Sequence, residues 1–534
     1  MTTYLLDQLI SRSAERAPTR EALSSGTSVW NYTALASAVS AFASGIVELG
    51  IARQDRVAIY LEKRLETVVA SFGATAAGAV FVPLNPLLKP EQVGYILRDC
   101  NVRMLITSSD RLALLSAMLA QCPDLRQVIV TDDPTPNVGA QAETPRCVLP
   151  VTSWPDLLKS PAGRRHRVID TDIAAILYTS GSTGSPKGVV LSHRNMVIGA
   201  KSVASYLHNH AEDTLLAALP LSFDAGFSQL TTAFYVGARA VLINYLMPRD
   251  VLNAVVKERV TGLTAVPPLW IQLSQLKWPP TVTEHLRYIA NTGGRMPLET
   301  LNVLRKHLPR TKPYLMYGLT EAFRSTYLSP EEVDRRPDSI GKAIPNAEIL
   351  VLREDGTPCD IDEPGELVHR GALVGMGYWN DPEKTAERYK PLPGREAGLV
   401  MPEIAVFSGD TVRQDKEGFL YFVGRRDEMM KTSGYRVSPT EVEEVIYGTQ
   451  LVGEVAAFGV PHPALGHAII LVATPKNGAA LTADVLLTAC RDRLPAYMVP
   501  ARVDVRDGPL PRNPNGKIDR KLLAALFVDL FRPA

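Results

Sequence analysis

A run of glycine and hydroxyl residues ends in a lysine, in the segment TSGSTGSPKG from Thr179 to Gly188. Glycine permits positive φ and close backbone approach, so successive N–H groups in such a run can surround an anion. Lys187 adds a positive charge, and further donors come from Thr179, Ser180, Ser182 and Thr183. We therefore predict a phosphate-binding loop, although a flexible Gly/Ser linker is the simpler alternative. It is not a Walker A loop, because Pro186 precedes Lys187 and no Ser or Thr follows it.

Five later segments have residue types suited to a nucleotide and a metal ion. They are NTGGRMP (291–297), MYGLTEA (316–322), SGD (408–410), GRRDEMMKTSGYRVSPTEVE (424–443) and NPNGKIDR (513–520). Together with the first run, they resemble in order and spacing the motifs of the adenylate-forming superfamily, which includes acyl-CoA synthetases, luciferases and the adenylation domains of peptide synthetases. The resemblance covers essentially the whole chain.

The resemblance implies an ATP-dependent ligase that forms an acyl adenylate, releases pyrophosphate and passes the acyl group to a phosphopantetheine thiol. Such a site must screen the repulsion between a carboxylate and a triphosphate. Lys517 would bridge the carboxylate and the phosphate, with Thr320 on the α-phosphate and Lys187 on the triphosphate. Glu321 would bind Mg²⁺, because a carboxylate is a hard oxygen ligand.

The remaining motif residues would bind the nucleoside. Tyr317 would offer an aromatic face to adenine, and Asp410 would accept both ribose hydroxyls. The other expected nucleotide contacts are Gly293, Gly294, Arg295, Gly318 and Arg425. Arg295 is a departure, because many relatives have Glu or Ala at this place.

Thioester formation needs different groups at the same carbonyl carbon, so the resemblance also implies a movable C-terminal unit. We expect residues 1–426 to form the large adenylation domain and 427–534 a small α+β lid domain, with the hinge at Asp427. Gly434 and Arg436 would line the path of the thiol. Since we recognise no carrier domain after residue 534, we expect CoA or a carrier protein to act in trans.

The segment LPLSFDAGFSQL (219–230) indicates what kind of acid would be activated. Acyl-CoA synthetases commonly have histidine after the phenylalanine, whereas this chain has Asp224 after Phe223. Amino-acid-activating domains use such an aspartate to hold the substrate ammonium group, and stand-alone prolyl-carrier-protein ligases look similar here. Alternatively, Asp224 caps the helix that follows. Over its whole length the chain also resembles acyl-CoA ligases of exosortase-linked exopolysaccharide systems.

Three functions therefore compete. The first is a ligase for a proline-like amino acid that loads a carrier protein, for which Phe223 and Asp224 would contact the substrate. The second is an acyl-CoA synthetase for a small or medium apolar acid. The third, a nucleotide-binding module without ligase chemistry, disagrees with the presence of Lys517, Glu321 and Asp410.

Composition is that of a soluble globular protein, with 46% hydrophobic and 21% charged residues in 534. A net charge of +1 offers no general field for nucleic acid or anionic membranes. Five scattered cysteines and an N-terminus without a basic-then-apolar pattern predict a cytoplasmic protein. The uncharged stretch between Glu66 and Lys89 contains two prolines and several polar residues, so we expect a buried helix and strand there, with no membrane insertion.

The elements that position these residues follow from the apolar patterns. Strands alternate with helices through residues 55–131 and again from residue 170, which predicts largely parallel sheets covered by helices. Short alternating strands separated by DG, PG and EG turns, in residues 348–426, predict an antiparallel β subdomain. Residues 132–167 are rich in Pro, Thr and charge, and we expect a surface connection. The predicted class is thus α/β, with a small α+β unit at the C-terminus.

Overall fold

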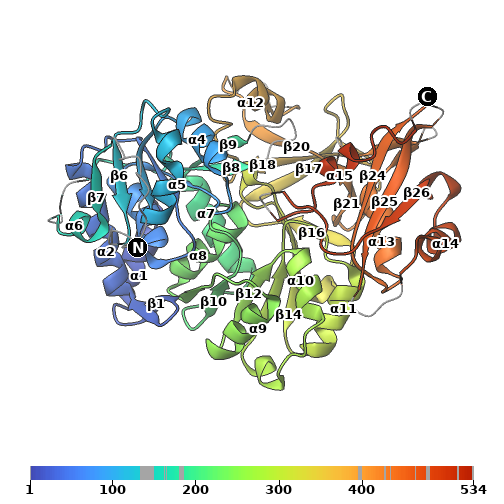
Figure 1. Ribbon diagram of the computed structural model, residues 1–534, viewed down its shortest axis with the longest axis horizontal. Coiled ribbons are helices and arrows are strands. Elements are labelled where there is room, and N and C mark those ends of the chain that lie inside the picture. The colour runs from blue at the N-terminus through green and yellow to red at the C-terminus, as the bar shows by residue number, and fades with distance from the viewer. Residues whose placement is uncertain are drawn as a thin grey trace, which may run out of the picture.

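The computed structural model describes residues 2–132, 149–160, 163, 165–179, 186–394, 398, 400–425, 428–432, 435–463, 465–476, 481–513 and 516–531. Its architecture confirms the predicted α/β class: two large sheets with their helices, followed by a smaller C-terminal unit (Figure 1).

The first sheet contains the βαβ units predicted from the first third of the chain. Its neighbouring strands run parallel from β7 to β8, and β9 returns antiparallel to β8. In spatial order its described strands are β7 (Val151–Ser153), β6 (Gln127–Val130), β5 (Val102–Thr107), β3 (Arg56–Tyr60), β4 (Val80–Pro83), β8 (Ile173–Thr179) and β9 (Lys187–Ser192).

The second sheet combines a parallel part with an antiparallel part. The parallel strands are β1 (Glu21–Ser25), β11 (Arg239–Leu242), β10 (Thr214–Ala217), β12 (Gly262–Ala265), β13 (Tyr288–Asn291) and β14 (Lys312–Tyr317), with β2 (Ser28–Asn31) antiparallel at the edge. The antiparallel strands are β15 (Thr326–Leu328), β16 (Ser339–Ala343), β21 (Leu420–Arg425), β20 (Ile404–Gln414), β18 (Gly365–Gly371), β17 (Ala347–Leu352) and β19 (Tyr389–Pro391). The antiparallel part contains the hairpins predicted between residues 348 and 426.

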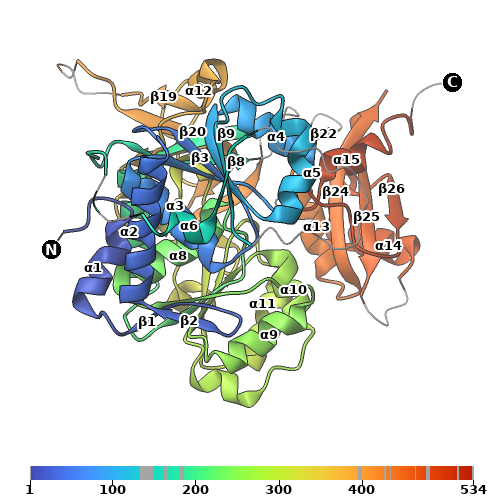
Figure 2. The same cartoon turned by 60° about the vertical axis from the view of Figure 1, so that its left-hand side comes forward.

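One apolar core, formed with strands of both sheets, includes helices α2 (Tyr32–Glu48), α3 (Leu65–Ala77), α7 (His193–Tyr206) and α8 (Asp224–Val236). The turned view shows α2, α3 and α8 together beside these strands (Figure 2). The other helices of this region are α1 (Gln8–Arg16), α4 (Pro90–Asp99), α5 (Ser109–Leu119), α6 (Trp154–Leu157), α9 (Pro248–Lys257), α10 (Pro267–Ser274), α11 (Leu298–His307) and α12 (Pro382–Arg388).

The C-terminal unit is built on a separate sheet. Its strands are β23 (Tyr435–Val437), β22 (Met430–Thr432), β25 (Gly466–Pro475), β24 (Val452–His462) and β26 (Arg502–Val505), with helices α13 (Pro439–Tyr447), α14 (Ala483–Arg493) and α15 (Arg520–Ala525). Strand β21 of the large sheet ends at Arg425 and β22 of the small sheet begins at Met430. The predicted boundary at Asp427 lies outside the described residues, so it stays a prediction.

Of the two predictions for whole regions, one is incomplete and the other is confirmed. Residues 132–167 are not only a surface connection, because β7 and α6 occur there; the Ser153 side chain caps α6, and Trp154 and Leu157 are buried. The stretch after Glu66 forms helix α3 and strand β4, as expected.

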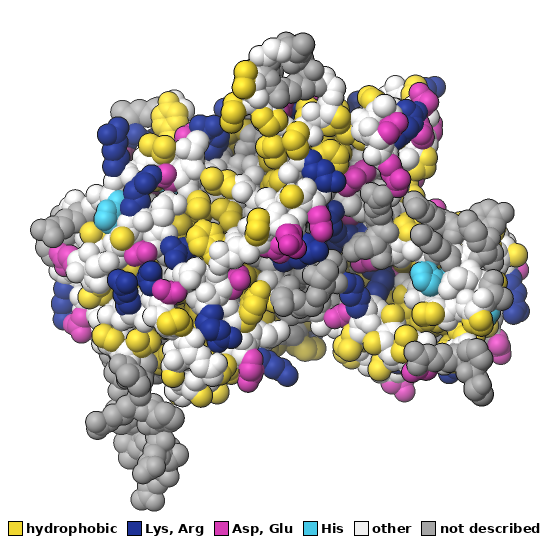
Figure 3. Space-filling view, turned by 90° about the horizontal axis from the view of Figure 1, so that it is seen from above, with side chains coloured by type: hydrophobic (Ala, Val, Ile, Leu, Met, Phe, Trp, Pro, Cys, Tyr) yellow, Lys and Arg dark blue, Asp and Glu magenta, His cyan; other side chains and the backbone are white. Residues whose placement is uncertain are grey.

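Within the described part of the chain, every helix is too short or too polar to cross a bilayer. Figure 3 shows basic and acidic side chains interspersed over one face.

Helix α8 begins against the backbone of the preceding loop, and Gly226 makes this possible. A Cβ built on Gly226 would lie 1.8 Å from the carbonyl oxygen of Pro220. We expect Gly226→Ala to lower the stability of the protein by about 1–3 kcal/mol, because the helix must shift away from that loop. Thermal unfolding would measure the effect. Gly94→Ala in helix α4, where the nearest atom lies 3.3 Å away on the flexible Arg98 side chain, is the matched control. Equal midpoints for the two variants would contradict this prediction.

Candidate active site

Three of the predicted segments lie where parallel strands of the second sheet end. The NTGG loop follows β13, the MYGLTEA segment follows β14, and Asp224 begins α8 after β10. Open parallel sheets bind ligands outside the carboxyl ends of their strands. In Figure 1 the C-terminal unit lies beside this edge of the sheet. We call the junction of the two units around Gly293 and Lys517 the cleft.

Lys517 reaches this cleft from the C-terminal unit. Its Cε atom would lie 3.9 Å from a Cβ built on Gly293, whose φ is +76°. The loop is fixed by Asn291, whose Nδ2 donates a hydrogen bond to the Gly294 carbonyl at 2.7 Å. Gly293 therefore provides both the turn and the space beside the lysine.

The electrostatic surroundings of Lys517 combine both signs of charge. Desolvation lowers the pKa of its ammonium group, and Arg425 lowers it further, while Asp410 and Asp224 oppose the change. Although neighbouring groups desolvate its ammonium end, Lys517 as a whole is exposed. A lysine in this position can act as a movable positive charge between two anions.

Asp410, which is buried in β20, forms a polar pair with the half-buried Tyr317 at the end of β14. The Tyr317 hydroxyl donates to Asp410 Oδ2 at 2.5 Å, and Arg425 Nε lies 3.1 Å from Asp410 Oδ1. Burial raises the pKa of Asp410, which Arg425 and Tyr317 partly oppose. Asp410 and Arg425 are cross-strand partners of β20 and β21, so the sheet register itself brings them together.

Tyr378 contacts both Glu321 and Lys187. The Tyr378 hydroxyl donates to Glu321 Oε1 at 2.6 Å, and Lys187 Nζ lies 5.4 Å from the centre of the same ring. Burial and the nearby Lys384 lower the pKa of Lys187. Among the described residues, no group of three or more His, Cys, Asp or Glu side chains could hold a metal ion. A single oriented carboxylate nevertheless fits Mg²⁺, which commonly takes one or two carboxylates together with substrate phosphates.

Asp224 has an internal partner that the sequence did not predict. Its Oδ2 lies 3.0 Å from Arg324 Nη1, and its Oδ1 accepts a hydrogen bond from Thr320 Oγ1 at 3.3 Å. Phe223 is the N-cap of α8 and no side chain caps the helix, so the helix-cap interpretation of Asp224 is wrong. The aspartate pairs with a buried guanidinium instead.

The backbone at Phe323 brings Thr320 and Arg324 to the same aspartate. Phe323 has φ +56° and ψ −42° at the end of the short 3₁₀ helix Thr320–Ala322, and its side chain is fully buried. A non-glycine residue in such a conformation costs about 1–3 kcal/mol, which the surrounding packing must offset. The reversal of the chain at this residue places Arg324 beside α8.

Arg295 contacts the C-terminal unit. Its Nε lies 3.3 Å from Glu444 Oε1 in α13. The predicted nucleotide contact of Arg295 therefore stays a prediction, while the structure gives this side chain a role between the two units. Gly318 packs against the backbone of Arg324, with a Cβ built on it 3.2 Å from the Arg324 Cα.

The other predicted residues are placed in part or not at all. Thr179 ends β8 and pairs with Lys187 across the hairpin. Arg436 lies in β23, and its side chain is not described. Ser180, Ser182, Thr183, Asp427 and Gly434 lie outside the described residues.

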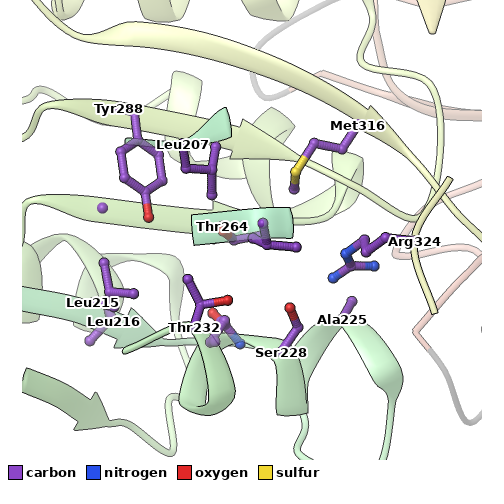
Figure 4. Close-up of a pocket in the computed structure, with 13 residues that line it drawn as sticks. Leu207, Leu215, Leu216, Ala225, Ser228, Thr232, Thr264, Tyr288, Met316 and Arg324 are labelled. Atoms are coloured by element: carbon purple, nitrogen blue, oxygen red, sulfur yellow. The ribbon is translucent and has the colours of Figure 1, made fainter. Parts of the chain in front are cut away.

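A cavity adjoins Arg324, and Met316 of the MYGLTEA segment also lines it (Figure 4). It is small, with a volume of about 20 Å³, and is lined from α8 by Ala225, Ser228, Gln229 and Thr232. Sequence reasoning missed this lining, together with Arg324 and Tyr378. Polar residues at helical spacing in an otherwise apolar helix were the available signal for the lining. Nothing in the local sequence marked Tyr378, which is 57 positions from Glu321.

Comparison with known proteins places these motifs in one family. The family model described as "AMP-binding enzyme" matches residues 10–379, and "AMP-binding enzyme C-terminal domain" matches residues 441–517. The chain is 30% identical to the long-chain-fatty-acid–CoA ligase of Salmonella typhimurium over 97% of its length and 94% of the relative. It is 29% identical to the feruloyl-CoA synthase of an Amycolatopsis species, covering 95% of this chain and 96% of the relative.

A solved structure agrees with this comparison over nearly the whole chain. The o-succinylbenzoate CoA synthetase of Bacillus subtilis, in complex with its acyl-adenylate intermediate, superposes with a TM-score of 0.81. The two are 26% identical, and the match covers 97% of each chain.

Tyr378 acts as a positioning residue for Glu321. We expect Tyr378→Phe to weaken the apparent Mg²⁺ affinity of the adenylation reaction about 10-fold, because outer hydrogen-bond partners orient metal-binding carboxylates. The variant keeps the aromatic ring beside Lys187, so it removes only the hydroxyl. Titration of ATP–pyrophosphate exchange with Mg²⁺ would measure the effect. Tyr389→Phe is the control, because that hydroxyl contacts the Glu321 backbone carbonyl, at 3.4 Å, rather than the Glu321 carboxylate. Unchanged Mg²⁺ dependence in Tyr378→Phe would contradict the assignment.

The pKa of Lys517 predicts a pH dependence. Since desolvation and Arg425 lower it from the ordinary 10.5, the protonated lysine is lost as the pH rises through a value below 10.5. We expect kcat/KM for adenylation to fall along that alkaline limb. Lys517→Arg should move the limb to higher pH, because a guanidinium stays protonated. The pH profile of adenylation in wild type and variant would check this, with the exposed Lys306→Arg as control. If the alkaline limb of the variant lies at the same pH as that of the wild type, a group other than Lys517 causes it.

Proposed function

The chain belongs to the AMP-binding enzyme family, and from this we propose that it is an AMP-forming acid–CoA ligase. It would activate an uncharged acid of small or medium size as the acyl adenylate and transfer the acyl group to CoA. The observation that supports this best is the position of Lys517 beside Gly293, facing Asp410 and Asp224 from the C-terminal unit.

The first half-reaction joins the acid to AMP. A carboxylate oxygen attacks the α-phosphorus, a new P–O bond forms, and pyrophosphate leaves. Lys517 and Lys187 reduce the repulsion between these anions. Thr320, whose hydroxyl donates to Asp224 at 3.3 Å, would contact the α-phosphate. Asp410 and Tyr317 would hold the nucleoside. Glu321 would hold Mg²⁺, which neutralises phosphate charge when bound.

The second half-reaction forms the thioester. The thiolate of CoA attacks the acyl carbonyl carbon, and AMP leaves with the electrons of the broken C–O bond. Lys517 occupies the cleft during the first step and would have to withdraw for the second. We propose that the C-terminal unit turns about Asp427 for this purpose, and that Gly434 and Arg436 line the path of the thiol.

The pairing of Asp224 supports an uncharged acid over the proline-like amino acid. A substrate ammonium group needs a counter-charge that is not already neutralised, since an unpaired charge is costly away from water. Arg324 already neutralises Asp224 in this structure. The same contact makes Asp224→Ala a poor test of the substrate: it would leave the buried Arg324 without its partner and reduce activity with any acid.

The relatives support CoA as the acceptor over a carrier protein. The Salmonella, Amycolatopsis and Bacillus proteins named above are all described as forming CoA thioesters. Each match covers at least 94% of both partners, so the resemblance includes the C-terminal unit that would admit the thiol.

A panel of acids tests the proposal directly. We expect ATP–pyrophosphate exchange with uncharged straight-chain or aromatic acids, and none above background with L-proline or other amino acids. Mass spectrometry after addition of CoA should detect the matching acyl-CoA with one AMP released per thioester. Lys517→Ala should lower exchange about 100-fold or more, because it removes charge that acts in the transition state.

Two results would overturn the proposal. Exchange driven by an amino acid, without acyl-CoA from any acid, would restore the carrier-loading function. Binding of ATP without exchange for any acid would favour a nucleotide-binding module.

A further inference from the structure

We propose that Arg388, the last residue of helix α12, binds the pyrophosphate half of ATP and holds it as it leaves, and that Lys384 of the same helix adds a second positive charge. The inference rests on the proposed function, because it assumes that the chain binds ATP and forms an acyl adenylate. It goes further by assigning the β and γ phosphates to a helix that contributes no residue to the sequence motifs.

Helix α12 is fixed between the segment that carries Tyr378 and strand β20. The Thr385 hydroxyl accepts a hydrogen bond from the Tyr378 backbone N–H at 2.9 Å, and a Cβ built on Gly377 would lie 2.7 Å from the Thr385 side chain. In both cartoon views α12 lies beside β20, the strand that carries Asp410 (Figures 1 and 2). Contacts on two sides therefore determine where the last turn of this helix lies.

The guanidinium of Arg388 lies against the backbone of Gly409, the residue before Asp410. Its Nη1 donates to the Phe407 carbonyl at 3.2 Å, and a Cβ built on Gly409 would overlap the same nitrogen. Gly409 has φ +70°, so glycine is needed here both for the turn and for the close approach of the guanidinium. Among the described residues no carboxylate forms an ion pair with Arg388, so most of its N–H donors stay available to an anion.

The charge of Arg388 acts on active-site groups that come from different elements. Burial raises the pKa of Asp410 and that of Tyr378, and the positive charge of Arg388 opposes both changes. Burial lowers the pKa of Lys187, and the charges of Lys384 and Arg388 lower it further. Arg388 is therefore within electrostatic reach both of the residue expected to bind the ribose and of those beside the expected metal and triphosphate.

Lys187, Lys384 and Arg388 form a cluster of cations that fits a highly charged anion. They come from β9 and α12, and like charges are unfavourable together unless an anion lies between them. Glu387 lies 3.3 Å from Lys384 and neutralises only part of this charge. Pyrophosphate carries more negative charge than the AMP phosphate or the carboxylate of the acid, so it is the reactant that matches this cluster best.

The chemistry of adenylation gives Arg388 a defined task. Pyrophosphate leaves with the electron pair of the bond between the α-phosphorus and the bridging oxygen, so negative charge grows on it as that bond breaks, and no proton is transferred. A guanidinium suits this leaving group, because its planar donors can bind two phosphate oxygens at once and it stays protonated. Arg388 belongs to the large unit, so its contact does not depend on the position of the C-terminal unit that carries Lys517.

Ligands that have or lack the terminal phosphates test the proposal. Isothermal titration calorimetry would compare Mg·ATP and Mg·pyrophosphate with AMP and with an acyl-sulfamoyl adenosine, which lacks the β and γ phosphates. We expect Arg388→Gln to weaken the binding of Mg·ATP and Mg·pyrophosphate about 10-fold or more, the value of a charge-assisted hydrogen bond, and to leave the other two affinities within about 2-fold. Arg388→Lys should lose less, because it keeps the charge.

Exchange kinetics provide a second readout. In ATP–pyrophosphate exchange Arg388→Gln should raise the KM for pyrophosphate about 10-fold and leave the KM for the acid unchanged. Lys384→Gln should act in the same direction but more weakly, because Glu387 already neutralises part of its charge. Lys390→Gln is the matched control, because Lys390 follows α12 directly in β19 and lies over the Phe407 ring at 5.0 Å. The KM for CoA should be the same in all these variants.

The outcomes separate this inference from the proposed function. A selective loss of Mg·ATP and Mg·pyrophosphate affinity in Arg388→Gln, with an unfolding midpoint like the wild type, supports the inference. Unchanged affinities overturn it, and so does an equal loss for AMP in both Arg388 variants, which would make the residue a support of the ribose site. A raised KM for CoA in place of pyrophosphate also overturns it. The absence of exchange with every acid would overturn the proposed function, while calorimetry of Mg·ATP against AMP would still decide the role of Arg388.

Discussion

The ion pair between Asp224 and Arg324 separates two environments that the rest of the site depends on. On one side lie the cations and carboxylates that would meet a triphosphate, and on the other lies a cavity without a free charge. Neither partner is stable in a buried position alone, because removing one leaves the other charge uncompensated. The unusual backbone at Phe323 is the local cost of bringing Arg324 to this position.

The cations of the cleft come from separate parts of the fold. Lys187 begins β9 in the first sheet, Arg425 ends β21 in the second, and Lys517 belongs to the C-terminal unit. Gathering like charges is unfavourable unless anions lie between them. Asp410 and Glu321 provide part of that compensation, and a bound nucleotide would provide the remainder. The site is therefore most stable as a closed assembly of all its parts with substrate present.

The sequence predicts local elements well and long-range pairings poorly. The predicted strand GELVHRG coincides with β18, although its three central residues are all buried rather than alternating, and Gly78 ends α3 in the left-handed conformation that its type favours. The motifs also identified residues that lie in one cleft. Tyr378 and Arg324 were missed because their roles depend on contacts with Glu321 and Asp224 that only the folded chain creates. The same holds for Arg295, whose observed partner is in another unit.

The ion pair between Arg295 and Glu444 holds the two units together only weakly. The two side chains keep 32% and 23% of their surface exposed. An ion pair this accessible to water contributes at most about 1 kcal/mol, and dissolved salt screens it further. Such a contact can guide the C-terminal unit over the cleft without trapping it there. A weak contact would suit the withdrawal of the C-terminal unit that we propose for thioester formation.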